Sequence, residues 1–267
     1  MPFDIREPKN IQEFKDLEKL QMDIWQEDVF EPGETLFIIH KNGGVVLSAY
    51  DPKLHDSKPI GFVFGLLGRE PTGELKHASH MLGILAAYRD KKLGEALKWA
   101  QRERILAQGL KRMTWTYDPL ESRNAYLNLH KLGAVCRRYY VNLYGDMGGI
   151  NQGLPSDRFE VDWHVSSHRV EAKQQGIYQD TDVKAACLNP NQNLKPCEKP
   201  LSLSEVRHLI EIPMNFQAIK QQDRALASAW RFQIRELFQK AFAQGYQASD
   251  LIQDKARQKS FYLIEAI

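Results

Sequence analysis

A short basic turn has the residue types best suited to chemistry in this sequence. Residues 89–95 read Arg-Asp-Lys-Lys-Leu-Gly-Glu and connect an apolar run to an amphipathic segment that starts near Lys92. We expect the apolar run to be a strand and the amphipathic segment a helix. The first N–H groups of a helix lack intrahelical partners and carry partial positive charge, so they bind anions such as phosphate. Lys91 and Lys92 would add full charges, and Gly94 would let a ligand approach the backbone.

Two histidines, His77 and His80, precede this turn on one predicted strand, residues 74–88. Their odd spacing places the two side chains on opposite faces of a strand. This arrangement argues against a two-histidine metal site, and we predict no metal. A single strand histidine is more often a hydrogen-bonded structural group than a catalyst, and for His80 both interpretations stay open.

The elements that must position these residues alternate between strands and helices. Asn10 is a predicted N-cap with Glu13 as its capping-box partner. The predicted strands are residues 3–6, 45–50, 60–67, 74–88, 113–117, 135–144 and 158–165, and the predicted helices start after Asn10 and cover residues 36–40, 92–108 and 122–131. We expect an α/β fold. On the helix 92–108 we expect an apolar core face, with Gln101, Arg102 and Glu103 mostly outside.

The C-terminal third of the sequence loses this regular alternation. Residues 166–200 are rich in Gln, Lys, Asn, Asp and Pro, and we interpret them as a long connection. The predicted elements after it are a strand at 207–212, a helix at 223–244 and a strand at 261–267. We therefore predict a first domain at residues 1–165, a linker at 166–205 and a small strand-helix-strand extension at 206–267 that packs on the first domain.

Composition limits the function classes. The 267 residues include 36 basic and 34 acidic side chains, a net charge of +2, which argues against a general nucleic-acid-binding protein. Cys136, Cys187 and Cys197 suit neither a close-spaced metal site nor an even disulfide set, so we expect a reducing cytoplasm. The N-terminus lacks the features of a signal peptide, and no apolar run approaches ~18 residues, so we expect no membrane segment.

The order of these pieces resembles the GNAT superfamily of acyl-CoA-dependent N-acyltransferases. Arg89-x-x-Lys92-x-Gly94 is similar to the family's Gln/Arg-x-x-Gly-x-Gly/Ala turn at its first and last positions, although Lys92 replaces a glycine. Asn124-Ala125-Tyr126 through Leu132-Gly133-Ala134 resembles the later helix and its Leu-Gly break. The likeness covers roughly Asp4 to Trp163. It implies a GNAT-like fold, in which helices flank a mixed sheet, and acetyl-CoA or another acyl-CoA as co-substrate.

The resemblance also assigns roles to individual residues. The strand before the turn and the strand at 113–117 would part so that pantetheine lies between them. The implied acyl-CoA contacts are the backbone of Ile84, Leu85 and Ala86, the turn residues Arg89, Lys91, Lys92, Leu93, Gly94 and Glu95, and Asn124. His80 lies where a general base or a water would act. Leu129 replaces the family's general-acid tyrosine, and Tyr126 and His130 are the nearby alternatives.

We therefore predict a cytoplasmic enzyme that moves an acetyl group from acyl-CoA to a primary amine of a small molecule. Succinyl is the alternative acyl group if Arg138 or Arg158 grips its carboxylate. A non-catalytic acyl-CoA-binding or regulatory protein on the same scaffold is the alternative function, favoured by Lys92 and Leu129. A third interpretation, based on the C-terminal segment, is a member that transfers aminoacyl or peptide groups and has a tandem degenerate repeat. A homodimer stays open.

Overall fold

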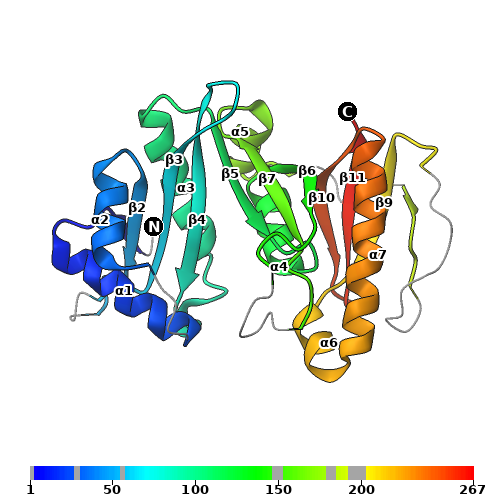
Figure 1. Ribbon diagram of the computed structural model, residues 1–267, viewed down its shortest axis with the longest axis horizontal. Coiled ribbons are helices and arrows are strands. Elements are labelled where there is room, and N and C mark those ends of the chain that lie inside the picture. Colours follow the sequence, from blue (N-terminus) through cyan, green and yellow to red (C-terminus); the bar gives the residue numbers. More distant parts are fainter. Residues whose placement is uncertain (1–2, 27–30, 55–57, 146–152, 179–184, 192–202) are drawn as a thin grey trace. The chain divides into compact units, whose positions relative to one another are not determined.

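The computed structural model of the chain describes residues 3–26, 31–54, 58–145, 153–178, 185–191 and 203–267 (Figure 1). Contacts divide the chain into two compact units. The first unit contains residues 1–115 with 164–166, and the second contains residues 116–163 with 167–267. The predicted division at residues 165 and 205 stays a prediction. Residues 146–152 and Cys197 lie outside the described residues.

The first unit carries the predicted alternation of strands and helices. It consists of β1 (Asp4–Arg6), α1 (Ile11–Trp25), α2 (Gly33–Lys41), β2 (Val45–Tyr50), β3 (Gly61–Arg69), β4 (Leu75–Ile84), the 3-10 helix η1 (Ala86–Tyr88), α3 (Leu93–Ala107) and most of β5 (Arg112–Tyr117). The predicted N-cap of α1 is confirmed, because Asn10 Oδ1 accepts a hydrogen bond from the Glu13 N–H at 3.1 Å. The predicted strand 74–88 is too long: it ends at Ile84 and continues as η1.

The strands of this unit form a mixed sheet in the order β1-β2-β3-β4-β5. The pairs β1–β2, β2–β3 and β3–β4 are antiparallel. The β4–β5 pair is parallel, with α3 as the crossover between the two strands. A mixed sheet flanked by helices is the predicted fold class.

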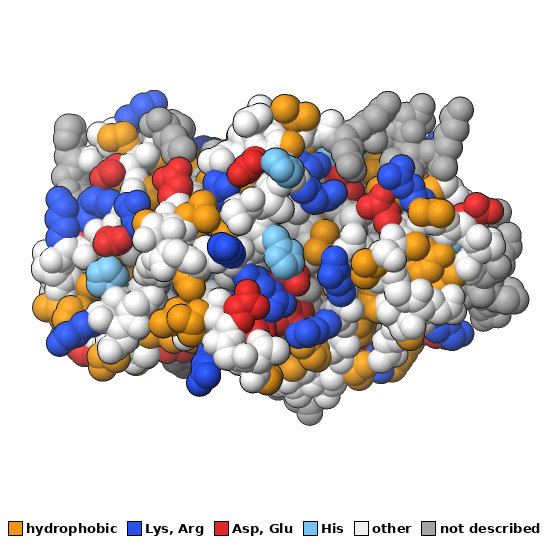
Figure 2. Space-filling view, turned by 90° about the horizontal axis from the view of Figure 1, so that it is seen from above, with side chains coloured by type: hydrophobic (Ala, Val, Ile, Leu, Met, Phe, Trp, Pro, Cys, Tyr) orange, Lys and Arg blue, Asp and Glu red, His pale blue; other side chains and the backbone are white. Residues whose placement is uncertain are grey.

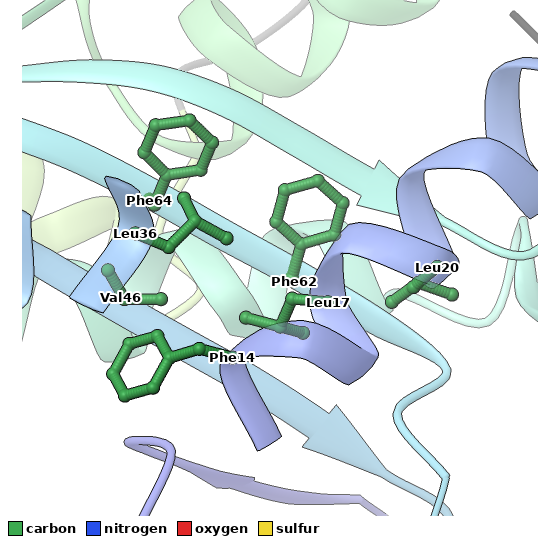
Figure 3. Packing of buried hydrophobic residues seen from close by; sticks show 7 residues of the cluster. All are labelled: Phe14, Leu17, Leu20, Leu36, Val46, Phe62 and Phe64. Atoms are coloured by element: carbon green, nitrogen blue, oxygen red, sulfur yellow. The ribbon is translucent and has the colours of Figure 1, made fainter. Parts of the chain in front are cut away.

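A hydrophobic core joins α1 and α2 to one face of this sheet (Figure 3). Its fully buried side chains are Phe14, Leu17, Leu20, Leu36, Val46, Phe62 and Phe64. Phe62 and Phe64 are two residues apart on β3 and therefore share a face. The helix α3 packs on β2, β3 and β4 through other residues, among them His77 and Ser79 of β4, which hydrogen-bond to α3.

The prediction that three residues of α3 face the solvent is wrong for two of them. Gln101 is fully buried and Arg102 is 6% exposed, whereas Glu103 is exposed as expected. Gln101 hydrogen-bonds to side chains of β4, and Arg102 Nε donates to the Val165 carbonyl at 2.6 Å. Polar partners on the buried side compensate these groups, and hydrophobic periodicity does not register such partners.

The strands of the second unit follow one another in the order β7-β6-β10-β11-β9-β8. Its strands are β6 (Val135–Tyr140), β7 (Arg158–His164, whose last residue belongs to the first unit), β8 (Ala186–Cys187), β9 (Arg207–Pro213), β10 (Tyr246–Asp254) and β11 (Lys259–Ala266). Its helices are α4 (Ser122–Ala125), the π-helix η2 (Tyr126–Lys131), α5 (His168–Gln174), α6 (Phe216–Gln222) and α7 (Arg224–Ala243). Phe159, Phe238 and Tyr262 form an edge-to-face aromatic core.

Two predictions for this part of the chain need correction. The segment 166–200 is not only a connection, because it contains α5 and β8. The C-terminal region is more than one strand-helix-strand set, because β10 lies between α7 and β11 and pairs with both β11 and β6. The pattern of β10 is hard to recognise since buried Ser249 and Asp250 interrupt its apolar residues. Among the described residues, every helix is too short or too polar to span a membrane.

Candidate functional site

A β-bulge interrupts β4 at His80. Phe64 of β3 pairs with Met81, and the next residue, Gly65, pairs with Ser79, so His80 is the extra residue. A bulge leaves its extra residue outside the regular ladder and bends the strand. As a result, the Ser79 side chain meets α3, whereas Met81 packs on the core beneath α1 and α2.

The strands β4 and β5 part immediately before this bulge. Their parallel pairing consists of His77 with Met113 and Ala78 with Thr114. The stretch Ser79–Ile84 continues to pair with β3 but has no β5 partner. Its backbone N–H and C=O groups on that side are therefore available to a ligand that binds as an added strand. The predicted parting of these two strands is confirmed.

The turn after β4 has an unusual backbone. Asp90 and Lys92 have φ values of 65° and 61°, in the left-handed region that favours glycine. Lys92 is the N-cap of α3 and makes no side-chain cap hydrogen bond. The first intrahelical bond is from the Ala96 N–H to the Lys92 carbonyl, 3.0 Å. The N–H groups of the preceding residues 93–95 thus form the open end of the helix, which favours an anion.

Three cationic residues lie in the turn that leads into this open helix end. Arg89, Lys91 and Lys92 are all exposed, and the Lys91 ammonium lies 4.6 Å from the centroid of the Tyr88 ring. Tyr88 in turn donates a hydrogen bond to Asp51 at 3.1 Å. Elsewhere, basic and acidic side chains are interspersed on the described part of the face drawn in Figure 2. The local charge and the helix end together suit a pyrophosphate group.

The predicted pantetheine-binding residues differ in whether their backbone N–H and C=O groups already have hydrogen-bond partners. Ile84 is the last residue of β4 and pairs only with Gly61 of β3. Leu85 already donates its N–H to the Ile60 carbonyl at 3.0 Å and accepts from the Tyr88 N–H at 2.9 Å. Ala86 lies in η1 and accepts from the Arg89 N–H at 3.2 Å. The open backbone of β4 therefore lies before Leu85, in the stretch from Ser79 to Ile84.

His80 lies at the bulge with its side chain 48% exposed. Its Nε2 is 3.9 Å from Glu31 Oε1, and its ring meets Phe64 edge-on with centroids 5.4 Å apart. His77 is on the other face and fully buried, as the odd spacing predicts. Burial, followed by the charge of Lys98, lowers the pKa of His77 to about 3. His77 is therefore a neutral structural group, and the role of the exposed His80 as a general base stays a prediction.

Sequence reasoning missed a buried polar network beneath the bulge. Lys98 Nζ donates to Ser79 Oγ at 2.9 Å and to Gln101 Oε1 at 3.0 Å. Ser79 also donates to Gln101 Oε1 at 3.0 Å, and the Gln101 amide nitrogen lies 3.0 Å from His77 Nε2. The available signal was a lysine and a glutamine three positions apart on a helix, beside Leu97 on its buried side.

The remaining predicted catalytic and cofactor residues lie in the second unit. Asn124 is exposed, and Tyr126 stacks on His130 with centroids 4.6 Å apart. His130 Nδ1 is 3.0 Å from Asp250 Oδ1, and the Tyr178 ring also stacks on the imidazole, with centroids 4.9 Å apart. The structure thus brings Tyr126 and His130 together. Their roles as general acids, and that of Asn124 as a cofactor contact, stay predictions.

The two predicted carboxylate-binding arginines have different surroundings. Arg138 is 58% exposed at its side chain and donates to Glu160 at 3.1 Å. Arg158 is buried, donates to the Asp157 carbonyl at 2.9 Å and lies 3.9 Å from Asp118. Their binding of substrate stays a prediction. No group of three or more His, Cys, Asp and Glu side chains among the described residues is arranged to hold a metal ion.

Comparison with known proteins finds similarity in structure and none in sequence. No protein-family model and no curated protein matches the sequence. The solved NatC complex bound to Gag peptide and CoA aligns with 61% of this chain and 99% of that chain, at 17% identity and a TM-score of 0.50. The ribosomal-protein-S18-alanine N-acetyltransferase from Escherichia coli covers 62% of this chain and 95% of that chain, at 11% identity and 0.48.

An acetyltransferase of the GNAT family from Streptococcus pneumoniae also aligns, over 60% of this chain and 97% of that chain, at 17% identity and a TM-score of 0.48. The NatC match confirms the predicted fold.

Proposed function

We propose that this protein, which has the GNAT fold, binds an acyl-CoA and transfers the acyl group to a primary amine of a small molecule. The observation that carries the proposal is the pairing of two features in one unit. The β4 backbone is open from Ser79 to Ile84, and the basic end of α3 follows it after a short turn. A ligand with an amide-bearing arm and a pyrophosphate matches both features in that order.

The open end of α3 and its cations would hold the pyrophosphate. The backbone of residues 93–95 offers N–H groups, and Arg89, Lys91 and Lys92 offer charges that stay solvated without a ligand. The β4 edge would hydrogen-bond the amides of the arm, so that side-chain identity there matters little. Binding to both features orients the acyl group at the bulge, and orientation of this kind supplies up to ~7–11 kcal/mol in well-aligned reactions.

The acyl thioester would supply an activated carbonyl carbon. His80, exposed at the bulge, would take a proton from the attacking ammonium either directly or through a water. Unpaired N–H groups of Ser79–Ile84 would stabilise negative charge on the carbonyl oxygen. Leu129 is fully buried and cannot donate a proton, but a thiolate is a tolerable leaving group near neutral pH.

The test is turnover of acetyl-CoA with a panel of amines, followed by detection of free thiol. The panel combines small primary amines with short peptides that have free N-termini, because NatC is solved with a Gag peptide. Thiol release that depends on a small amine supports the proposal. Turnover of peptides alone would move the acceptor to a protein N-terminus. CoA binding without thiol release for any acceptor would support the non-catalytic alternative instead.

A charge variant tests the binding site itself. Replacing Lys91 and Lys92 together with Gln should weaken CoA binding by about tenfold or more, because two cations next to the pyrophosphate are lost. Lys19→Gln is the matched control, since this lysine is 71% exposed on α1 of the same unit. Equal affinity of both variants would place the CoA site elsewhere on the chain.

A further inference from the structure

Lys98 has a buried amino group at the point where β4 and β5 part. The residue is 3% exposed, although it lies on the second turn of α3. Its Nζ donates to Ser79 Oγ of β4 at 2.9 Å and lies 3.7 Å from the centroid of the Trp115 ring of β5. It is also 3.6 Å from the sulfur of Met113. One amino group therefore contacts both strands.

Ser79 and Trp115, two of the residues that Lys98 contacts, occupy matching positions on β4 and β5 just beyond the point where the strands stop pairing. Ala78 and Thr114 form the last parallel pair, so Ser79 and Trp115 are the next residue on each strand. Continued pairing would have placed them side by side. The Lys98 amino group connects them instead, and it lies where the open stretch of β4 begins.

Simple stabilisation does not account for this lysine. No carboxylate of a described residue lies within ion-pair distance of its Nζ, and its acceptors Ser79, Gln101 and Met113 are all neutral. A buried amine without an anionic partner is costly whether it keeps its proton or gives it up, and methionine would fill the same volume without that cost. Such a group is commonly retained for a function.

We propose that Lys98 is a positioning residue for the acyl-CoA arm. By holding Ser79 against α3 and resting on Trp115, it fixes the bulge and the start of the open β4 edge in the geometry that accepts the amides of the arm. This inference rests on the proposed function. It adds that affinity for the arm, and not for the phosphates, depends on a buried side chain of α3.

The test separates the arm of CoA from its phosphates. The probes are coenzyme A and 3′-phosphoadenosine 5′-diphosphate, which carries the same phosphates without pantetheine. Both are titrated calorimetrically into the full chain, as wild type and as the Lys98→Met, Ser79→Ala and double variants. We expect each single variant to lose about tenfold in affinity for coenzyme A and to keep its affinity for the fragment.

The double variant tests whether the two residues act as one unit. If Lys98 acts through Ser79, the double variant binds coenzyme A as the Lys98→Met variant does, without an additive loss. Unchanged coenzyme A affinity in folded single variants would overturn the inference and leave the proposed function intact. Equal loss for both probes would also overturn it, because a general structural role would weaken both.

Failure of the proposed function gives a different result. Wild-type protein would then bind neither probe, and the inference would fall with it. If Lys98→Met does not fold, Ser79→Ala removes only one hydroxyl group and decides the question by the same two titrations.

Discussion

Ser79 and Met81 are two residues apart on β4, yet their side chains lie on opposite faces of the sheet. Ser79 hydrogen-bonds to Lys98 of α3, and Met81 packs beneath α1 and α2. Residues at this spacing normally share a face, and the extra residue His80 between them is what changes the side. The bulge thus gives α3 a contact at the start of the open edge and leaves an imidazole exposed beside it.

The first prediction concerns His80. If it is the base, His80→Gln should lower kcat/KM by about a hundredfold or more, because glutamine cannot accept the proton from the amine. Coenzyme A affinity should stay within about twofold, since the phosphates bind elsewhere. His168→Gln is the control, because this imidazole is fully exposed on α5. Wild-type kcat/KM in His80→Gln would assign the proton transfer to water alone.

The second prediction concerns Lys92, whose φ of 61° is strained for a residue with a Cβ. Lys92→Gly should raise the free energy of unfolding by about 0.5–1 kcal/mol, measured by urea denaturation, while the lost charge weakens coenzyme A binding. Lys91→Gly is the matched control, because Lys91 is not among the described residues with positive φ. The Lys91→Gly variant should therefore show no increase in the free energy of unfolding. A gain of equal size in both variants would contradict the role of the left-handed backbone.

The third prediction concerns pH. Burial lowers the pKa of Lys98 well below 10.5 in the folded chain, whereas the unfolded chain keeps the ordinary value. Between these two pKa values the unfolded state holds one more proton, so Lys98 contributes stability above pH 10.5 that is lost as the pH falls towards the folded pKa.

Comparison with Lys98→Met isolates this effect from other titrating groups. The difference in unfolding free energy, wild type minus variant, should rise with pH by up to about 1.4 kcal/mol per unit within that window. Urea denaturation of both proteins from about pH 7 to about pH 10 measures it. A difference that stays constant over this range would show that the buried amine keeps its proton throughout.

The fourth prediction concerns the second unit, where Arg231 holds Asp118 through two parallel hydrogen bonds. Arg231 is 2% exposed, and the nearby Asp118 carboxylate outweighs the effect of burial and raises the pKa of the guanidinium. Asp118→Asn should destabilise the protein by about 3–5 kcal/mol, because it leaves a buried cation without its counter-charge.

Removing both charges provides the comparison. Asp118→Leu combined with Arg231→Met should be less destabilised than Asp118→Asn, as measured by urea denaturation. A double variant that is less stable than the single one would mean that the pair is net stabilising.

Periodicity and turn chemistry predicted most elements of the first unit, because its strands and helices have regular apolar spacing and clear caps such as Asn10. Apolar periodicity failed to predict β10 in the second unit, because the polar residues Ser249 and Asp250 are buried there. Asp250 is stabilised there by His130, a partner distant in sequence. A local pattern cannot register a partner 120 residues away.

The candidate site shows the same limit. The basic turn could be predicted because phosphate binding depends on local features, namely a helix start and nearby lysines. The position of the bulge could not be predicted from the sequence, because it depends on the register of β4 against β3. The burial of Lys98 could not be predicted either, because one of its acceptors, Ser79, lies on β4 and is distant in sequence.

The π-helix η2 has a consequence for how this chain is compared with others. The Leu132 N–H bonds to the Leu127 carbonyl, five residues back, so one residue more than an α-helix requires is accommodated in this turn. Side chains after such an insertion point about 100° away from their α-helical directions. The residue spacing of a regular α-helix therefore cannot be used to match the side chains of Tyr126–Lys131 to positions in another protein.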